Sequence, residues 1–544
     1  MPGTKSDDRV VHRMSSAAPK PAAISGAPPR WLDSRRAKVL ACATGASFMI
    51  MLDSNIVGVS LASISRDLHA PFTDIEWVVS GYILTFASLL MSAGAIADRY
   101  GRRQLLVIGI VIFTLASLAC GLAPTASLLN WARALQGVGA AIQLSATLAV
   151  LGHEFRGPDR ARAFGIWGMV MGIAVAAGPL VGGLITSGFG WRWSFLVNVP
   201  FGIVLVALAA KAVENSRDPD ATRLDVAGIL TFGTGLALLV WGLINASVDG
   251  WSSQVTLFRF AGSVGALALF VMVELMQKRP MIDFSLFRKQ TFLGGAVAMV
   301  GFASAAQVMM TYLPLYLQNV FAFNPALAGV AMLPFAVPLF IFPRIAANLA
   351  TKVSGRAILT LGLVIVAVGN FVTAGAAAGQ ASYLITAVGM VLTGCGAGLL
   401  NSETAKVLMS VIPPERAGMA SGISATLRFV GLVTSVSGLG AVLSAFTQKQ
   451  FQGLSPDTSV AIASSSSDVK LTIARIVAGD IQGAAAALPD LARATFVEIS
   501  RAAFASGFSV VLSVAGVVAM IAALLTYLLV SASVTAPHRP AAEK

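Results

Sequence analysis

Apolar stretches of about 20 residues recur along the whole 544-residue chain, and each is long enough to cross the ~30 Å hydrocarbon core of a bilayer as a helix. The stretches are continuously apolar and do not alternate, which excludes a membrane β-barrel. Hydrophobic residues make up 56% of the chain and charged residues only 12%, whereas soluble domains carry about 25% charged residues. We therefore expect an all-α polytopic membrane protein.

The hydropathy pattern predicts about fourteen spanning helices. Their expected bounds are 39–61, 75–97, 104–122, 127–151, 161–184, 194–212, 224–246, 258–276, 290–312, 325–345, 357–377, 380–404, 416–446 and 504–530. An even number of spans places both termini on the same side of the membrane.

Basic residues gather in the loops that follow the even-numbered spans. Arg99, Arg102 and Arg103 follow the second span, and comparable groups follow the fourth, sixth, eighth and tenth. Cytoplasmic loops carry such an excess of Lys and Arg, so we expect both termini to be cytoplasmic. This distribution also accounts for the net charge of +13 without a nucleic-acid partner.

Other function classes find little support in the sequence. The three cysteines lie inside apolar runs and the four histidines lie in tails or loops, so no metal site is expected. The chain contains no Gly-Lys dipeptide and hence no GxxxxGK[ST] phosphate loop. With no nucleophile–base pattern either, we expect no enzyme and no cofactor. Uphill transport would draw on an ion gradient.

The segment GAIADRYGRRQLL, residues 94–106, concentrates charge between two apolar runs. Basic residues alone would anchor a cytoplasmic loop, but that role does not need an acid. The acid, Asp98, therefore needs another explanation.

This segment resembles the signature between helices two and three of the major facilitator superfamily. The resemblance implies a conformational latch on the cytoplasmic side, formed by Gly94, Asp98, Arg99, Gly101, Arg102 and Arg103. Four more segments resemble family motifs in the family's order: MLDSNIVGVSLA (51–62), LLNWARALQGVGAA (128–141), GIWGMVMGIAVAAGPLVGG (165–183) and WRWSFLVNVPFG (191–202). The first departs from the family pattern at Asn55, Gly58 and Ala62 but retains Asp53. Over about residues 39–530, the chain is similar to the fourteen-helix drug:proton antiporter branch.

The resemblance implies two six-helix bundles with an extra helix pair between them. The implied organisation is a disordered cytoplasmic tail (1–38), an N-terminal bundle (39–212), two linking helices (213–289), a C-terminal bundle (290–530) and a cytoplasmic tail (531–544). Residues 447–503 form a long extracytoplasmic loop, in which LARATFVEISRAAF is read as an interfacial amphipathic helix or as a docking element.

Asp53 is the expected proton carrier. Counting along the first and fourth spans places Asp53 and Arg133 at similar depth in the membrane. An acid within the membrane is costly unless it is paired or functional. A static, purely structural ion pair is the alternative. Arg428 also lies inside a span, and the sequence names no partner for it.

Two further groups of residues receive roles. The resemblance implies an antiporter motif on the fifth helix, formed by Gly168, Gly172, Gly178, Pro179, Gly182 and Gly183. Polar and aromatic residues in the spans are candidates to line a substrate cavity, although core packing or interface anchoring also explains such residues; they are Trp77, Tyr82, Gln136, Gln143, Trp167 and Tyr312.

We therefore expect a multi-pass transporter of the cytoplasmic (inner) membrane that exports hydrophobic or amphipathic, mainly cationic drugs in exchange for protons by alternating access. An exporter of one physiological metabolite is the first alternative, and a membrane sensor that has lost transport is the second. The sequence does not identify the substrate, the proton stoichiometry, the oligomeric state or a periplasmic adaptor.

Overall fold

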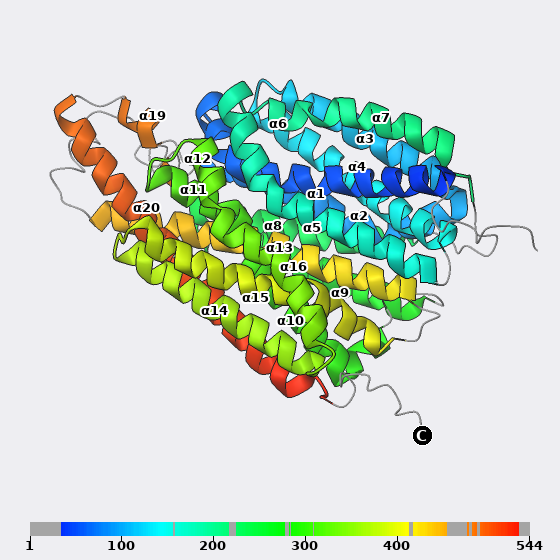
Figure 1. Cartoon of the computed structure of the whole chain (residues 1–544). Helices are drawn as coiled ribbons and strands as arrows, with labels where there is room; N and C mark the ends of the chain where they lie inside the picture. Colours follow the sequence, from blue (N-terminus) through cyan, green and yellow to red (C-terminus); the bar gives the residue numbers. More distant parts are fainter. Residues whose placement is uncertain are drawn as a thin grey trace, which may run out of the picture.

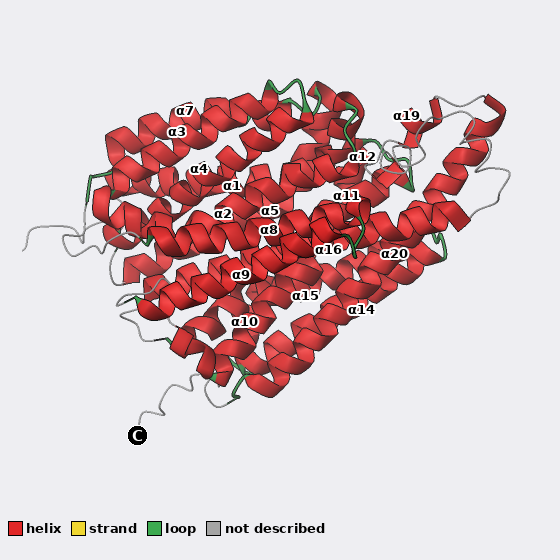
Figure 2. Ribbon diagram, turned by 180° about the vertical axis from the view of Figure 1, so that it is seen from behind, coloured by secondary structure: helices red, strands yellow, loops and turns green. Residues whose placement is uncertain are grey.

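The computed structural model describes residues 34–155, 158–216, 225–277, 282, 284–307, 309–412, 417–453, 476–477, 481–486 and 490–532. Most of these residues are helical, and none of them lies in a strand (Figure 2). The predicted tails, apart from 34–38 and 531–532, and much of the predicted loop 447–503 lie outside the described residues.

The first half of the chain forms one helical bundle. Its helices are α1 (Ser34–Leu68), α2 (Phe72–Tyr100), α3 (Arg102–Gly121), α4 (Ala126–Glu154), α5 (Pro158–Phe189), α6 (Trp193–Leu196) and α7 (Asn198–Ala212). In this bundle α4 packs against α2 and α3, and α1 packs against α5 and α7. Thr125 starts α4, since its side chain accepts a hydrogen bond from the backbone N–H of Leu128 at 3.3 Å.

The second half forms another bundle beside the first (Figure 1). It contains α10 (Gln290–Phe302), the π-helical turn η2 (Ala303–Gln307), α11 (Met309–Asn319), α12 (Pro325–Ala331), α13 (Leu333–Leu349), α14 (Gly355–Ala378), α15 (Tyr383–Ser410), α16 (Ala417–Gly453) and α20 (Asp490–Leu529). The short helix α19 (Ile481–Ala486) packs on α20, and the 3₁₀ turn η1 (Phe284–Arg288) precedes α10.

A helix pair connects the two bundles. α8 (Val226–Asp249) and α9 (Gln254–Met276) pack against each other, and α8 also contacts α2 of the first bundle and α16 of the second. Both helices correspond to the spans predicted at 224–246 and 258–276.

The described residues contain twelve helices long and apolar enough to cross a membrane, or thirteen if α12 and α13 form one span bent by 40°. The predicted total of fourteen and the predicted side of the termini stay predictions. Several helices extend beyond their predicted bounds, for example α1 and α20, because the apolar pattern marks only the part of a helix that faces hydrocarbon. Hydropathy also gave no sign of the break at Met332 between α12 and α13 or of the turn η2.

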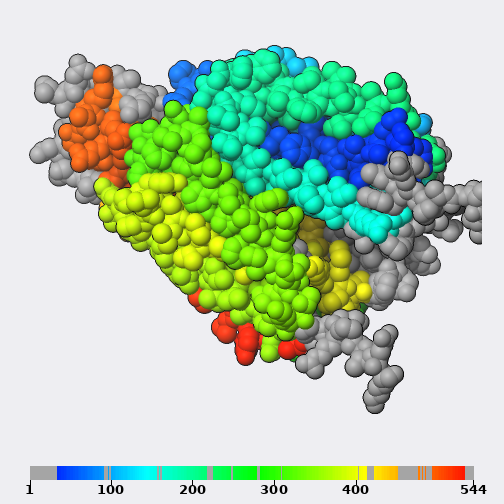
Figure 3. Space-filling view, in the orientation of Figure 1, coloured from blue at the N-terminus to red at the C-terminus, as the bar shows by residue number. Residues whose placement is uncertain are grey.

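The two bundles meet through the end of the molecule that holds the α1–α2 turn. Here α5 packs on α12, and α1 packs on α11. The amide of Gln318 donates to the carbonyl oxygen of Val59 at 2.9 Å, and the N–H of Ala326 donates to the hydroxyl of Ser187 at 2.8 Å. We call this the closed end. In the space-filling view, the blue and cyan surface of the first bundle adjoins the green surface of the second (Figure 3).

Candidate functional site

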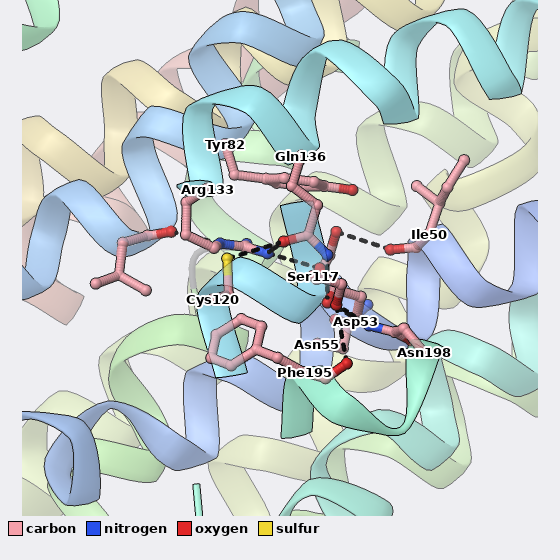
Figure 4. A network of polar contacts seen from close by, with 12 residues as sticks. Ile50, Asp53, Asn55, Tyr82, Ser117, Cys120, Arg133, Gln136, Phe195 and Asn198 are labelled. Atoms are coloured by element: carbon pink, nitrogen blue, oxygen red, sulfur yellow. Dashed lines mark hydrogen bonds and ion pairs between the residues drawn. The ribbon is translucent and has the colours of Figure 1, made fainter. Parts of the chain in front are cut away.

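A buried polar network surrounds Asp53 in the middle of α1. Nη1 of Arg133 lies 2.7 Å from Oδ2 of Asp53. The amides of Gln136 and Asn198 donate to Oδ1, at 2.9 Å and 2.8 Å. The side chains of Asp53 and Arg133 are 0% and 1% exposed. α1, α4 and α7 thus converge on one carboxylate (Figure 4).

The guanidinium of Arg133 is held on several sides. Nη1 also donates to Oε1 of Gln136 at 2.7 Å, and Nε donates to the carbonyl oxygen of Val78 at 2.9 Å. Its carbon lies 4.1 Å from the ring centroid of Tyr82 and 5.6 Å from that of Phe195. Arg133 and Gln136 are one helical turn apart on α4, so both reach the same face of that helix.

An outer layer of polar groups supports the network. The amide of Asn198 donates to the hydroxyl of Ser117 at 3.0 Å, and that hydroxyl donates to the carbonyl oxygen of Phe195 at 2.9 Å. The thiol of Cys120 lies 3.7 Å from Oε1 of Gln136. The sequence analysis did not predict that Asn198, Ser117 and Cys120 belong to this network. The available signal was Asn198, a polar residue within the apolar motif 191–202.

Hydrogen-bond counting defines the chemistry of this carboxyl group. Three donors, from Arg133, Gln136 and Asn198, point at the two oxygens of Asp53. Such convergence is the pattern that an ionised carboxylate accepts, because a protonated carboxyl would turn its own O–H toward one of the donors.

The charged segment 94–106 lies at the turn between α2 and α3. The side chains of Asp98 and Arg99 and the surroundings of Gly94 lie outside the described part of the structure. Gly101 has φ of 118°, a conformation that only glycine adopts readily. The N–H of Arg102 donates to the carbonyl oxygen of Ser216 at 3.0 Å, so the turn contacts the segment that follows α7.

The glycines of α5 allow close packing against two neighbours, α1 and the second bundle. A Cβ added at Gly178 or Gly182 would overlap Asn55 or Ile56 of α1, so these glycines allow close packing within the first bundle. Gly183 instead faces the second bundle.

Contacts with the second bundle continue along α5. A Cβ at Gly183 would overlap the carbonyl oxygen of Pro325, and one at Gly329 would overlap that of Pro179. Gly172 faces Phe340, whereas nothing lies within 4 Å of a Cβ built at Gly168. One helix therefore packs on α1 and on the opposite bundle at the same time.

The predicted cavity residues lie at separate places. Tyr82 and Gln136 belong to the Asp53 network. Gln143 donates to the carbonyl oxygen of Ala46 at 2.7 Å, and the indole N–H of Trp167 donates to the hydroxyl of Ser47 at 2.9 Å.

The remaining two lie elsewhere, Tyr312 at the closed end and Trp77 packed partly buried against the core. The lining of a substrate cavity by these six residues stays a prediction.

The side chains of Arg428 and Lys406 also make polar contacts. Nε of Arg428 donates to Oε1 of Gln307 at 3.0 Å, and the guanidinium lies 5.5 Å from the ring of Phe302. Nζ of Lys406 lies 2.5 Å from Oε1 of Glu403, three residues away on α15. Among the described residues, no group of three or more His, Cys, Asp and Glu side chains is placed to hold a metal ion.

Comparison with known proteins adds the following. A sequence profile described as Major Facilitator Superfamily matches residues 43–436. The multidrug resistance protein Stp of Mycobacterium tuberculosis is 35% identical over 74% of this chain and 75% of its own length. The tetracenomycin C resistance and export protein of Streptomyces glaucescens is 30% identical over 93% of both chains.

A solved structure has the same fold. It is the inward-facing, unoccupied form of a bacterial homologue of the human lysosomal transporter Spinster. The TM-score is 0.59, with 16% identity over 93% of this chain and 98% of that chain.

Proposed function

Because this chain belongs to the major facilitator superfamily, a family of membrane transporters, we propose that it is a proton-coupled antiporter that exports hydrophobic or amphipathic, mainly cationic compounds. We place it in the cytoplasmic membrane, with both termini in the cytoplasm. Its partners are then the exported small molecule, protons and the lipid bilayer.

Relatives support the export of drug-like compounds. Stp is named for multidrug resistance, and the Streptomyces glaucescens protein for tetracenomycin C resistance and export. Both align with at least 74% of this chain, so the likeness extends over most of the transporter body.

The observation that carries proton coupling is the fully buried Asp53 network. Its three donors hold an ionised carboxylate in this conformation, and separating α1, α4 and α7 would free an oxygen to accept a proton. A proton that binds Asp53 from outside and leaves toward the cytoplasm supplies about 2.3 kcal/mol per 100 mV of membrane potential. Each unit of pH gradient adds about 1.4 kcal/mol.

The place where the bundles meet supports alternating access. The closed end carries the α1–α2 turn, which the distribution of basic residues assigns to the outside. This conformation is therefore the one proposed to face the cytoplasm. The segment 94–106 lies at the opposite ends of α2 and α3, and we propose that it latches that side when the molecule faces outward.

The test uses inverted membrane vesicles that contain the protein. The vesicles are energised, and a pH-sensitive dye reports proton release while cationic dyes, antiseptics and metabolites are added one at a time. We expect release with cationic amphipathic compounds from the wild type and none from Asp53→Asn. Asp67→Asn is the matched control, because Asp67 is on the same helix but exposed and paired with Arg192.

Each alternative has its own result. Release triggered only by one metabolite would replace drug export with metabolite export. No release with any compound, with the protein confirmed in the membrane, would favour a transport-inactive sensor. Release that persists in Asp53→Asn would remove Asp53 as the proton carrier.

A further inference from the structure

A second buried acid lies where the two bundles meet, and the Asp53 network does not use it. Glu76 of α2 is 4% exposed. Its Oε1 lies 3.2 Å from the hydroxyl of Tyr312 on α11, across the boundary between the bundles. The same hydroxyl is hydrogen-bonded to the carbonyl oxygen of Val436 on α16.

The surroundings of Glu76 are dry and mostly apolar. Leu61, Ile75, Val79 and Val436 line the space around it, together with Tyr312, and they leave no room for a water molecule. An isolated ionised carboxylate in such surroundings is so costly that the group takes up a proton instead.

The charges of the neighbouring helices do not change this balance. Among the described residues, no cationic group lies within 4 Å of the carboxyl of Glu76, and Tyr312 is the titratable group that faces it. The cation of α4, Arg133, is bound to Asp53. Asp74, also on α2, is an acid and offers no positive charge.

Proton counting at Tyr312 leads to the same conclusion. The hydroxyl of Tyr312 carries one proton and can donate one hydrogen bond. It faces the carbonyl oxygen of Val436 and a carboxyl oxygen of Glu76, and when Glu76 is ionised neither of these oxygens carries a proton. When Tyr312 donates to Val436, its contact with Glu76 is a hydrogen bond only if the acid donates. A protonated Glu76 thus satisfies all three groups at once.

The fit of the acid depends on a glycine of the opposite bundle. A Cβ added at Gly440 on α16 would overlap both Oε1 of Glu76 and the hydroxyl of Tyr312. One turn farther along α2, the hydroxyls of Ser80 and Ser437 lie 3.3 Å apart. The contact between α2, α11 and α16 is therefore closely packed around Glu76.

We propose that Glu76 is a second proton-binding site, which is protonated while the closed end is shut and must lose its proton for that end to open. When α2 separates from α11 and α16, the carboxyl group reaches solvent and ionises. This inference rests on the alternating access of the proposed function. The proton of Glu76 binds and leaves on the same side of the membrane, so we assign it to gating. The proton of Asp53 is assigned to transport.

Spin labels across the closed end provide the test. Gly188→Cys on α5 and Leu327→Cys on α12 place one label on each bundle at exposed positions beside their contact. The native cysteines, at 42, 120 and 395, are replaced by alanine. Pulsed electron resonance then measures the distance between the labels from pH 5 to pH 9 in lipid nanodiscs, without substrate or gradient.

The wild type should shift from a short to a long distance as the pH rises, with the closed-to-open ratio falling by up to tenfold per pH unit. Glu76→Gln has the shape of the protonated acid, so it should fold normally, and its closed-to-open ratio should stay high and independent of pH. Asp74→Asn is the matched control, because it removes a partly buried acid of the same helix, and it should follow the wild type.

Two results would overturn the proposal. One is a wild-type distance that does not change with pH. The other is a Glu76→Gln protein that opens with the same pH dependence as the wild type. The vesicle assay separates this from the proposed function: Glu76→Gln should export more slowly but release the same number of protons per exported molecule, whereas failure of the antiport itself would abolish release in the wild type.

Discussion

A double-mutant cycle at Asp53 and Arg133 separates the structural role of the pair from its transport role. The two side chains are fully buried and lie 2.7 Å apart. Removing one partner leaves a buried charge without its counter-charge, which typically costs about 3–5 kcal/mol. Asp53→Asn and Arg133→Gln should each lower the free energy of unfolding by about this amount.

The double variant Asp53→Asn/Arg133→Gln should be more stable than either single variant. It replaces the ion pair with two neutral amides, which can still bond to Gln136 and Asn198. Replacing a buried ion pair with neutral groups is often close to neutral in stability. Unfolding by SDS titration in bicelles, followed by tryptophan fluorescence, measures all four proteins.

The surface pair of the same helix provides the control. Asp67 and Arg192 lie 2.5 Å apart, but their side chains are 46% and 40% exposed, so either substitution should cost less than about 1 kcal/mol. The reasoning fails if the double variant at 53 and 133 is destabilised by the sum of its single variants. If the double variant is stable and also exports with proton release like the wild type, the pair is structural only.

Three further results are expected. Gly183→Val would place its side chain on the carbonyl oxygen of Pro325 and should lengthen the spin-label distance at the closed end at all pH values; an unchanged distance would contradict the packing of α5 on α12. Gly101→Ala, at φ of 118°, should lower the free energy of unfolding by about 1–3 kcal/mol and with it the unfolding temperature; an unchanged unfolding temperature would contradict this. Gln307→Leu removes an acceptor of Arg428 and should cost about 1–3 kcal/mol in SDS titration, whereas Gln307→Glu should retain the contact.

The local pattern of the sequence was enough to place some groups but not others. Span boundaries set Asp53 and Arg133 at the same depth, and the structure brings them into contact. Asn198 joins them only because α6 and α7 turn back against α1 and α3, which is a tertiary arrangement that no local pattern encodes. The sequence likewise does not distinguish Ser117 from other small residues of an apolar helix, because its role depends on the same tertiary arrangement.

Glu76 shows the same limit more sharply. Its burial depends on α11 and α16, more than 200 residues away, and on Gly440, where the absence of a side chain gives it room. Sequence reasoning did not single it out. The glycines of α5 were expected to pack closely, but the sequence could not say that Gly178 and Gly182 face α1 while Gly183 faces the other bundle.

The most direct test of the account is proton-driven transport by the purified protein in liposomes. An imposed pH gradient should drive accumulation of a cationic substrate by the wild type. Asp53→Asn should lose this accumulation but retain exchange of labelled for unlabelled substrate, since exchange requires alternating access and no net proton movement. Accumulation by Asp53→Asn at the wild-type rate would contradict the assignment of Asp53 as the proton carrier.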